Sequence, residues 1–330
     1  MKKYLKYILH AVILIGLGVA AAKYLNGEEV LSALRTFNYG LAPLILALSA
    51  VYIFSKGWRF AVLMRPLSRL SGGIITKGYV AGTAATLLPG GVAARAGLMS
   101  QAGVPVEKSG APVAYSSILD QAVFVFGLLG AALWFEAARV PALVIMIILT
   151  LLGLVFLVPF LRTRVAHLAE WIAEKLKVLN QWRTFLSSMG EVSTARILLV
   201  SLAITFAGVV LQVVILDLCL RGFGLSVPYP TLFLAYILPT ILGRNSALPA
   251  GVGVTEAGMV GVLATAGQVD ADTGAAAAAI FRAATVLFHA LLGALVYFFA
   301  WKGEHEGKAA PGTSGPAAAF RKSPKGDIEG

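Results

Sequence analysis

The sequence predicts an all-α fold: a polytopic helical membrane protein with two interrupted, re-entrant-like helix motifs in an inverted internal repeat. Of its 330 residues, 58% are hydrophobic and only 13% are charged, whereas a soluble globular domain is about half apolar and about a quarter charged. Several apolar runs approach or exceed the roughly 20 residues that a helix needs to cross a bilayer. Two segments rich in proline and glycine interrupt these runs and resemble each other. Together these observations exclude a water-soluble enzyme.

The apolar runs follow one another along the chain. The first, 7–22, stands behind three lysines and predicts an uncleaved membrane helix, with a cleaved signal peptide as the alternative. Two shorter runs, 78–88 and 232–248, end at proline- and glycine-rich breaks, and a small-residue segment, 254–266, follows the second break. The remaining runs are expected to span the membrane. They are Leu41–Met64, Val113–Phe135, Ala142–Leu161, Ile197–Leu220 and Gly274–Trp301.

The hydrophilic segments predict the domain plan and the orientation. Residues 1–301 are expected to form a single integral membrane domain, and 302–330 a disordered cytoplasmic tail. With the N-terminus inside, most loop lysines and arginines fall on the cytoplasmic side, so we expect both termini to be cytoplasmic in a bacterial inner (plasma) membrane. Segment 162–190 has apolar residues at three- and four-residue intervals, which predicts an amphipathic helix at the cytoplasmic interface. A solvated cytoplasmic hairpin is the alternative.

The two interrupted segments predict two copies of one unit, at about 78–135 and 232–301. Each break has the pattern Leu-Pro-x-Gly-Val, and each following span contains Leu-Leu-Gly. Three predicted spans lie between the two breaks, so the second copy is expected to enter from the opposite face, as in many secondary transporters. Interrupted helices leave backbone groups that are tolerated only where they are buried or line a wet cavity. The breaks are Pro89, Gly90 and Gly91 in the first copy, and Pro249, Gly251 and Gly253 in the second.

Each copy carries two ionisable residues inside the predicted membrane region. They are Arg95 and Asp120 in the first copy, and Glu256 and Arg282 in the second. A charge at mid-bilayer costs at least ~2.5–3.5 kcal/mol, so each needs a partner or water. The sequence leaves open whether the charges pair between the copies or within each copy. It also leaves open whether they are structural pairs or a substrate site.

A headgroup site is the functional interpretation of these charges. The guanidinium groups of Arg95 and Arg282 are the candidates for binding a substrate headgroup, because they match phosphate geometry. Helix N-termini at the breaks would add positive potential. Lys56 and Arg59, near the end of their span, are expected to snorkel towards water. The candidate charge partners or cavity-lining residues are Asp120, Gln121, Arg244, Asn245, Glu256 and His289.

Other kinds of site find little support in the sequence. The formal net charge of +11 comes from loops and the tail, so no nucleic-acid partner is expected. The four histidines are scattered and there is one cysteine, so neither a metal site nor a cofactor is expected. No compact nucleophile–base arrangement occurs, so catalytic residues are not predicted, and whether the chain is an enzyme is uncertain, with the balance against it.

The stretch Leu-Pro-x-Gly-Val-Gly-Val-x-Glu-Ala-Gly at 248–258, with Arg282 and Leu-Leu-Gly after it, resembles the lysylphosphatidylglycerol synthase transmembrane-region family, also called the flippase-like domain family. The Pro-Gly-Gly-x-x-x-Arg stretch at 89–95 resembles it too, although Ala93 and Ala94 stand where the family often has a Gly-Glu pair. The resemblance covers most of 1–301. It implies a stand-alone member without the soluble synthase domain, and a connection to glycosyltransferase, polyprenyl-lipid or hopanoid pathways.

The sequence therefore favours a membrane lipid translocase or lipid-binding transporter, whose polar cavity between the repeats holds the headgroup of an anionic phospholipid or a lipid-linked glycan. Two alternatives stay open. One is an integral-membrane enzyme of lipid or glycolipid modification, with Asp120 or Glu256 as general base. The other is a non-catalytic membrane subunit of a hopanoid or polyprenyl-lipid pathway. Expected partners are anionic or glycosylated membrane lipids and lipid-pathway enzymes; the oligomeric state is open.

Overall fold

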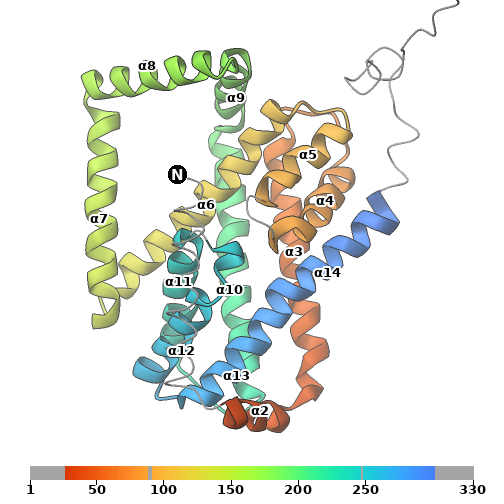
Figure 1. The fold of residues 1–330 in the computed structure, drawn as a ribbon, viewed down its shortest axis with the longest axis vertical. Helices are drawn as coiled ribbons and strands as arrows, with labels where there is room; N and C mark the ends of the chain where they lie inside the picture. The colour runs from red at the N-terminus through yellow and green to blue at the C-terminus, as the bar shows by residue number, and fades with distance from the viewer. Residues whose placement is uncertain (1–26, 88–90, 247, 302–330) are drawn as a thin grey trace, which may run out of the picture.

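The chain is helical over the part that the computed structural model describes, which is residues 27–87, 91–246 and 248–301. No strand occurs in those ranges (Figure 1). The predicted first span, the breaks at Pro89 and Gly90, and the tail lie outside them. Within them, four helical stretches are long and apolar enough to cross a bilayer. They are Tyr39–Met64, Val106–Ala131, Ala195–Arg221 and Ala271–Trp301.

The helices follow the chain from a short amphipathic helix to a long C-terminal rod. The first six described α-helices are α2 (Gly27–Thr36), α3 (Ala42–Met64), α4 (Gly72–Ala81), α5 (Ala94–Gln101), α6 (Val106–Ala131) and α7 (Glu136–Leu157). Those that follow are α8 (Pro159–Lys175), α9 (Leu179–Val192), α10 (Ala195–Arg221), α11 (Tyr229–Asn245), α12 (Val254–Gly267), α13 (Ala271–Arg282) and α14 (Phe288–Leu295). The short helical pieces are η1 (Tyr39–Leu41), η2 (Gly82–Leu87), η3 (Gly91–Ala93), η4 (Pro249–Gly251), η5 (Ala283–Leu287) and η6 (Val296–Trp301).

Proline positions move two helix boundaries away from the predicted ones. Helix α6 begins at Val106, seven residues before the predicted Val113, because Pro105 takes the extended conformation of an N-cap. Helix α7 ends at Leu157 rather than Leu161, because Val158 is extended and Pro159 opens α8. Both predicted runs fall largely within helices, but only α6 is among the helices long and apolar enough to span a membrane; in α7 the apolar part is the shorter Ala138–Leu151.

Regular α-helix stops on the described residues beside both predicted breaks. Helix α4 gives way to η2, and η3 leads into α5; likewise α11 gives way to η4 before α12. In the second break Ala250, Gly251 and Gly253 have φ values of 51°, 67° and 83°. Gly251 must be glycine, because a Cβ there would lie 2.9 Å from the backbone of Gly243. The piece η2, which precedes the first predicted break, contacts η4 of the second break. The inverted symmetry of the copies stays a prediction.

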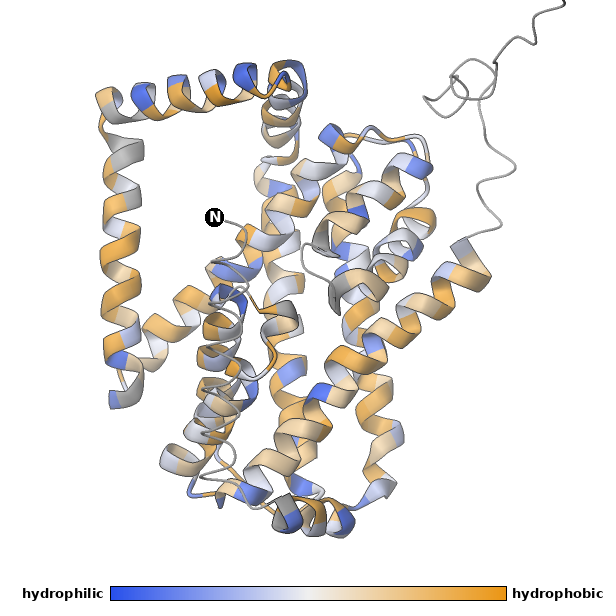
Figure 2. Cartoon of the chain, viewed as in Figure 1, coloured by the Kyte–Doolittle hydropathy of each residue, from blue (hydrophilic) through white to orange (hydrophobic). Residues whose placement is uncertain are grey.

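The predicted amphipathic segment is two helices and not one. Helix α8 ends at Lys175 and α9 begins at Leu179, because Lys177 takes a left-handed conformation with φ 57°. Helix α8 lies across the ends of α7 and α9 (Figure 1), and polar and apolar residues alternate along it (Figure 2). Its outer apolar side chains include Leu168 and Trp171, both more than half exposed. A helix of this kind suits a membrane interface.

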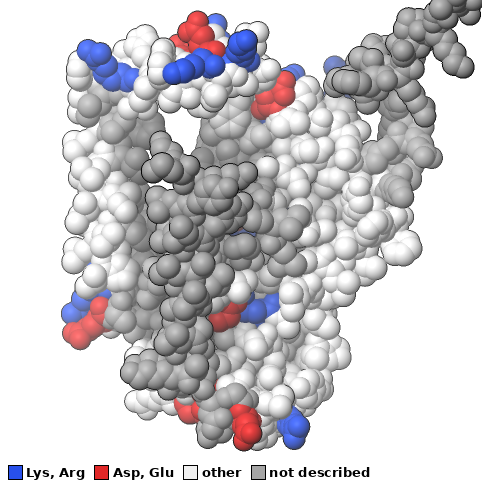
Figure 3. All heavy atoms as spheres, in the orientation of Figure 1, with Lys and Arg blue, Asp and Glu red and all other residues white. Residues whose placement is uncertain are grey.

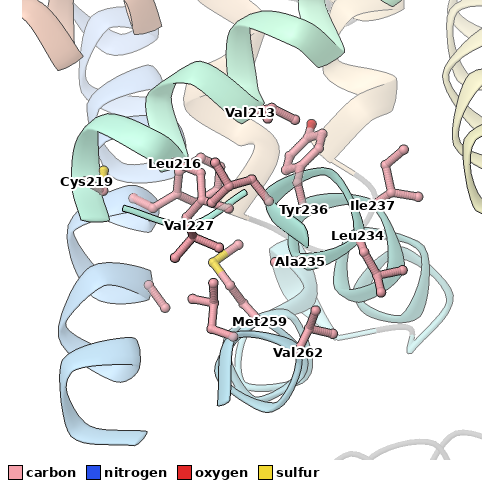
Figure 4. Packing of buried hydrophobic residues seen from close by; sticks show 14 of the residues in the cluster. Val213, Leu216, Cys219, Val227, Leu234, Ala235, Tyr236, Ile237, Met259 and Val262 are labelled. Carbon is pink, nitrogen blue, oxygen red and sulfur yellow. The ribbon is translucent and has the colours of Figure 1, made fainter. Parts of the chain in front are cut away.

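The main apolar core joins α10, α11, α12 and α13. Figure 4 shows Leu216 and Cys219 of α10, Tyr236 of α11 and Met259 of α12 around the same interior. The outer surface is also largely apolar: among the described residues on the face in Figure 3, charged atoms gather mainly at the upper and lower edges, with a few acidic and basic groups in the lower half between them. This distribution is that of a protein embedded in a membrane, and the chain is an integral membrane protein.

Asp270 is the N-cap of α13, immediately before the membrane span that begins at Ala271. Asp270 Oδ1 accepts hydrogen bonds from the backbone N–H groups of Thr273 at 2.9 Å and Asp272 at 3.1 Å, and hydrogen bonding from Thr273 holds the pKa of Asp270 below its usual range. We expect Asp270→Ala to cost about 1 kcal/mol of stability at neutral pH.

The lowered pKa fixes the sign of the pH dependence. The cap contributes fully above the ordinary aspartate pKa and is lost as the pH falls through the lowered one. Thermal midpoints of the detergent-solubilised protein measured between neutral and acidic pH test this. Asp270→Asn should retain most of the stability at neutral pH but lose the acid-dependent part. An Ala variant as stable as wild type at neutral pH would contradict the prediction.

Candidate functional site

A buried cluster of charges joins α3, α6 and α11. Asp120 of α6 accepts hydrogen bonds at Oδ1 from Lys56 Nζ and, at 2.6 Å, from Arg59 Nη1. The Arg59 Nη1 group also donates to the hydroxyl of Thr205 on α10, and Nη2 donates to the carbonyl of Ser116 at 3.3 Å. The side chains of Lys56, Arg59 and Asp120 are 7%, 0% and 11% exposed. These ion pairs are therefore held away from solvent.

Arg244 of α11 closes the cluster from its more open side. Its Nη1 lies 3.7 Å from Asp120 Oδ2, and its guanidinium carbon lies 4.7 Å from the centre of the Phe124 ring. The Arg244 side chain is 37% exposed. Arg244 is thus the most loosely held and the most accessible cation of the cluster.

The cluster is not neutral. Lys56, Arg59 and Arg244 contribute three formal positive charges, and Asp120 contributes one negative charge. The cluster therefore has a formal charge of +2, with a nitrogen of each cation within 4 Å of an Asp120 oxygen. Removing ions from water is costly unless opposite charges compensate them. This excess of positive charge, with Arg244 as its accessible member, favours the approach of an anion.

The second charge pair is tied to the second break. Arg282 Nε donates to Glu256 Oε1 at 2.5 Å, and Arg282 Nη2 donates to the carbonyl of Ala250 at 2.7 Å. Glu256 Oε2 accepts from the backbone N–H of Gly253, the N-cap of α12, at 2.6 Å. The chain's own carboxylate therefore occupies the N-terminus of α12, and Arg282 fixes the strained loop around Ala250.

The remaining arginine of the first copy lies on an aromatic ring. The guanidinium carbon of Arg95 in α5 is 4.0 Å from the centre of the Tyr79 ring of α4. Its buried Nε has no hydrogen-bond partner among the described residues, and neither has Oε1 of Gln121. Both groups retain unused hydrogen-bonding capacity inside the protein.

His289 and Asn245 make bonds within the protein. His289 Nε2 lies 2.8 Å from Ser49 Oγ and 3.0 Å from the Ser49 carbonyl, and its ring stacks on Tyr52 with centroids 5.7 Å apart. Asn245 Nδ2 donates to the carbonyl of Ile241 at 2.8 Å, one turn back on α11. Of the predicted helix-break residues, Gly91 lies in the short helix η3 and Pro249 lies in the short helix η4.

The structure selects among the pairings that the sequence left open. Glu256 and Arg282 pair within the second copy, whereas Asp120 pairs with neither Arg95 nor Arg282 in the described residues. The prediction that Lys56 and Arg59 snorkel is wrong, because both are buried against Asp120. A signal was present: Lys56 and Arg59 are three residues apart on one helix, so both can turn to the same buried face.

One of two comparisons with known proteins places the chain in a family. A search of curated proteins gives no match. A family model, described as "Lysylphosphatidylglycerol synthase TM region", matches residues 7–293 and so covers most of the chain, including the cluster around Asp120 and the Glu256–Arg282 pair. The chain belongs to this lysylphosphatidylglycerol synthase transmembrane-region family.

Proposed function

We propose that this protein binds and translocates a membrane lipid with a phosphate-bearing headgroup, either an anionic phospholipid or a lipid-linked glycan. The observation that carries the proposal is the formal +2 charge around Asp120. A phosphate group beside Arg244 would compensate this charge with the geometry that guanidinium groups recognise. Membership of a family named for a lipid-synthesising enzyme supports a lipid-related role.

Arg244 is the best-placed first contact for the headgroup, because it is accessible and its link to Asp120 is long. Arg95, with its unpartnered Nε, is the second candidate. Arg282 already serves Glu256 and Ala250 through two of its nitrogens, so a headgroup role for it would use Nη1 or require the pair to open. Opening of that pair is one way in which the two breaks would rearrange during translocation.

The carboxylates favour binding over general-base catalysis. Both oxygens of Asp120 face cations, and both oxygens of Glu256 accept hydrogen bonds. These cations and N–H groups stabilise the ionised form of each carboxylate, which disfavours either one as the acceptor of a substrate proton.

We propose a cytoplasmic position for both termini and an inner-membrane location. Arg164, Lys175 and Arg183 belong to α8 and α9, and cations gather along the upper edge, where α8 lies (Figure 3). The positive-inside rule assigns such an edge to the cytoplasm. Lys175 lies 5.0 Å from the Trp171 ring, a combination suited to an anionic membrane surface.

Mass spectrometry of the lipids retained by the purified protein tests the headgroup site. We expect wild type to enrich one phosphate-bearing lipid over the host membrane, and Arg244→Ala to lower that enrichment about tenfold, the equivalent of about 1.4 kcal/mol. Arg139→Ala is the matched control, because Arg139 forms only an exposed pair with Glu136. Equal enrichment in wild type and Arg244→Ala would refute the site.

A further inference from the structure

We infer that the apolar groove between α6, α10 and α11 binds a hydrocarbon chain of the same lipid whose headgroup is proposed to lie at Arg244. The groove has a volume of about 840 Å³. Its walls include Gly130 from the end of α6, Trp134 from the turn after it, Phe206 and Val210 from α10, and Phe233 from α11. The inference rests on the proposed function for the identity of the lipid, but the groove has its own test.

The groove is suited to hydrocarbon and not to a polar group. Its named walls are carbon-rich side chains, and Phe206 and Trp134 are 58% and 75% exposed. Gly130 enlarges it, because a Cβ at this position would meet no atom within 4 Å. A concave apolar surface at the level of the membrane gains by burying an apolar chain.

The groove leads to the charged cluster along two of its walls. On α6, Gly127 lines the groove and lies three residues from Phe124, whose ring contacts Arg244. On α11, Phe233 lines the groove and lies three residues from Tyr236, which packs on Phe124 with ring centroids 5.9 Å apart. Three residues rise about 4.5 Å along a helix. The apolar groove therefore comes within about one helical turn of Phe124, the ring that Arg244 contacts.

This juxtaposition identifies the occupant. An apolar groove that lies about one helical turn from the ring contacted by Arg244 is complementary to a molecule with an apolar tail and an anionic head. A lipid with a phosphate headgroup has both parts in that order. A soluble anion would leave the groove without a ligand, and a neutral hydrophobic molecule would leave Arg244 without an anion.

Photolabelling of the full-length protein tests the inference. The probe is phosphatidylglycerol with a diazirine-bearing acyl chain, in nanodiscs, and labelled peptides are mapped by mass spectrometry. We expect the groove segments 127–135 and 228–233 to be labelled more strongly than the exposed face of α7. Gly130→Phe, which fills the groove, should lower their labelling about tenfold. Gly153→Phe is the matched control, since a Cβ at Gly153 of α7 also meets no atom within 4 Å.

A second experiment, fluorescence quenching by brominated lipid, needs no substitution that fills the groove. Phosphatidylglycerol with brominated chains should quench the fluorescence of Trp134, measured as the difference between wild type and Trp134→Phe. This quenching should exceed that of Trp171 on α8, obtained in the same way. Equal quenching at both sites would mean ordinary contact with bulk lipid and would overturn the inference.

The outcomes separate the groove from the headgroup site. Groove labelling that survives Arg244→Ala but disappears in Gly130→Phe supports the groove and counts against the headgroup proposal. Lipid enrichment that depends on Arg244, with groove labelling no stronger than on α7, supports the headgroup site and overturns the groove. Crosslinking of the groove to residues 7–22 of the same chain, with no lipid label, would also overturn it.

Discussion

Replacing Asp120 by asparagine is expected to destabilise the protein by about 3–5 kcal/mol, the usual cost of removing one partner from a buried ion pair. The carboxylate is the shared partner of Lys56, Arg59 and Arg244. Asparagine keeps the size of the side chain but leaves three cations facing one another. Thermal unfolding in detergent, followed by size-exclusion chromatography of the surviving fraction, measures the loss.

An exposed pair provides the control for Asp120→Asn. Glu136 and Arg139 form an ion pair with side chains that are 87% and 56% exposed, and Glu136→Gln should cost less than about 1 kcal/mol. Removing a cation as well should restore part of the stability: Lys56→Met combined with Asp120→Asn is expected to recover about 1–3 kcal/mol relative to Asp120→Asn alone. Similar midpoints for Asp120→Asn and Glu136→Gln would show that the cluster is hydrated and not buried.

The membrane character of the fold could be predicted from the sequence because it depends on composition alone. An apolar run of span length must become a helix in lipid, whatever its neighbours are. The positions of α3, α6, α7 and α10 follow from this rule. Their ends do not, because Pro105, Val158 and Lys177 act through local backbone geometry. A hydropathy average over many residues does not resolve such single positions.

The charge partners could be predicted only in part. Glu256 and Arg282 are 26 residues apart and pair within one copy, which was one of two arrangements compatible with the spacing. Asp120 pairs with Lys56 and Arg59 from a helix more than 60 residues earlier, and that choice depends on how α3 packs against α6. A lysine near a helix end extends to water only if water is nearer than a carboxylate. The position of a residue in the sequence does not give these two distances.

The glycines of the two Leu-Leu-Gly tripeptides also show that packing partners cannot be predicted from the sequence pattern alone. Gly130 and Gly293 end identical tripeptides in the two predicted copies. A Cβ at Gly130 meets no atom within 4 Å, whereas a Cβ at Gly293 would lie 2.4 Å from Thr83 Oγ1 and 2.7 Å from the Val80 carbonyl. The glycine of the second copy is therefore the place where α14 touches the end of α4 and η2, the segment before the first predicted break. The glycine of the first copy has no such contact.

Gly293→Ala is accordingly expected to destabilise the protein by about 1–3 kcal/mol, the usual cost of overpacking a close contact. The Cβ would also lie 2.6 Å from the backbone nitrogen of Ala84 in η2, so a side-chain rotation cannot relieve the clash and α14 must move away from the break. Gly130→Ala, the matched change in the other copy, should leave stability unchanged or raise it by up to about 1 kcal/mol, since alanine favours a helix over glycine. Thermal midpoints of both variants in the same detergent decide the matter. Equal midpoints would mean that η2 and α14 are not in contact in the folded protein, and that the first break is held by something other than the helix that follows the second.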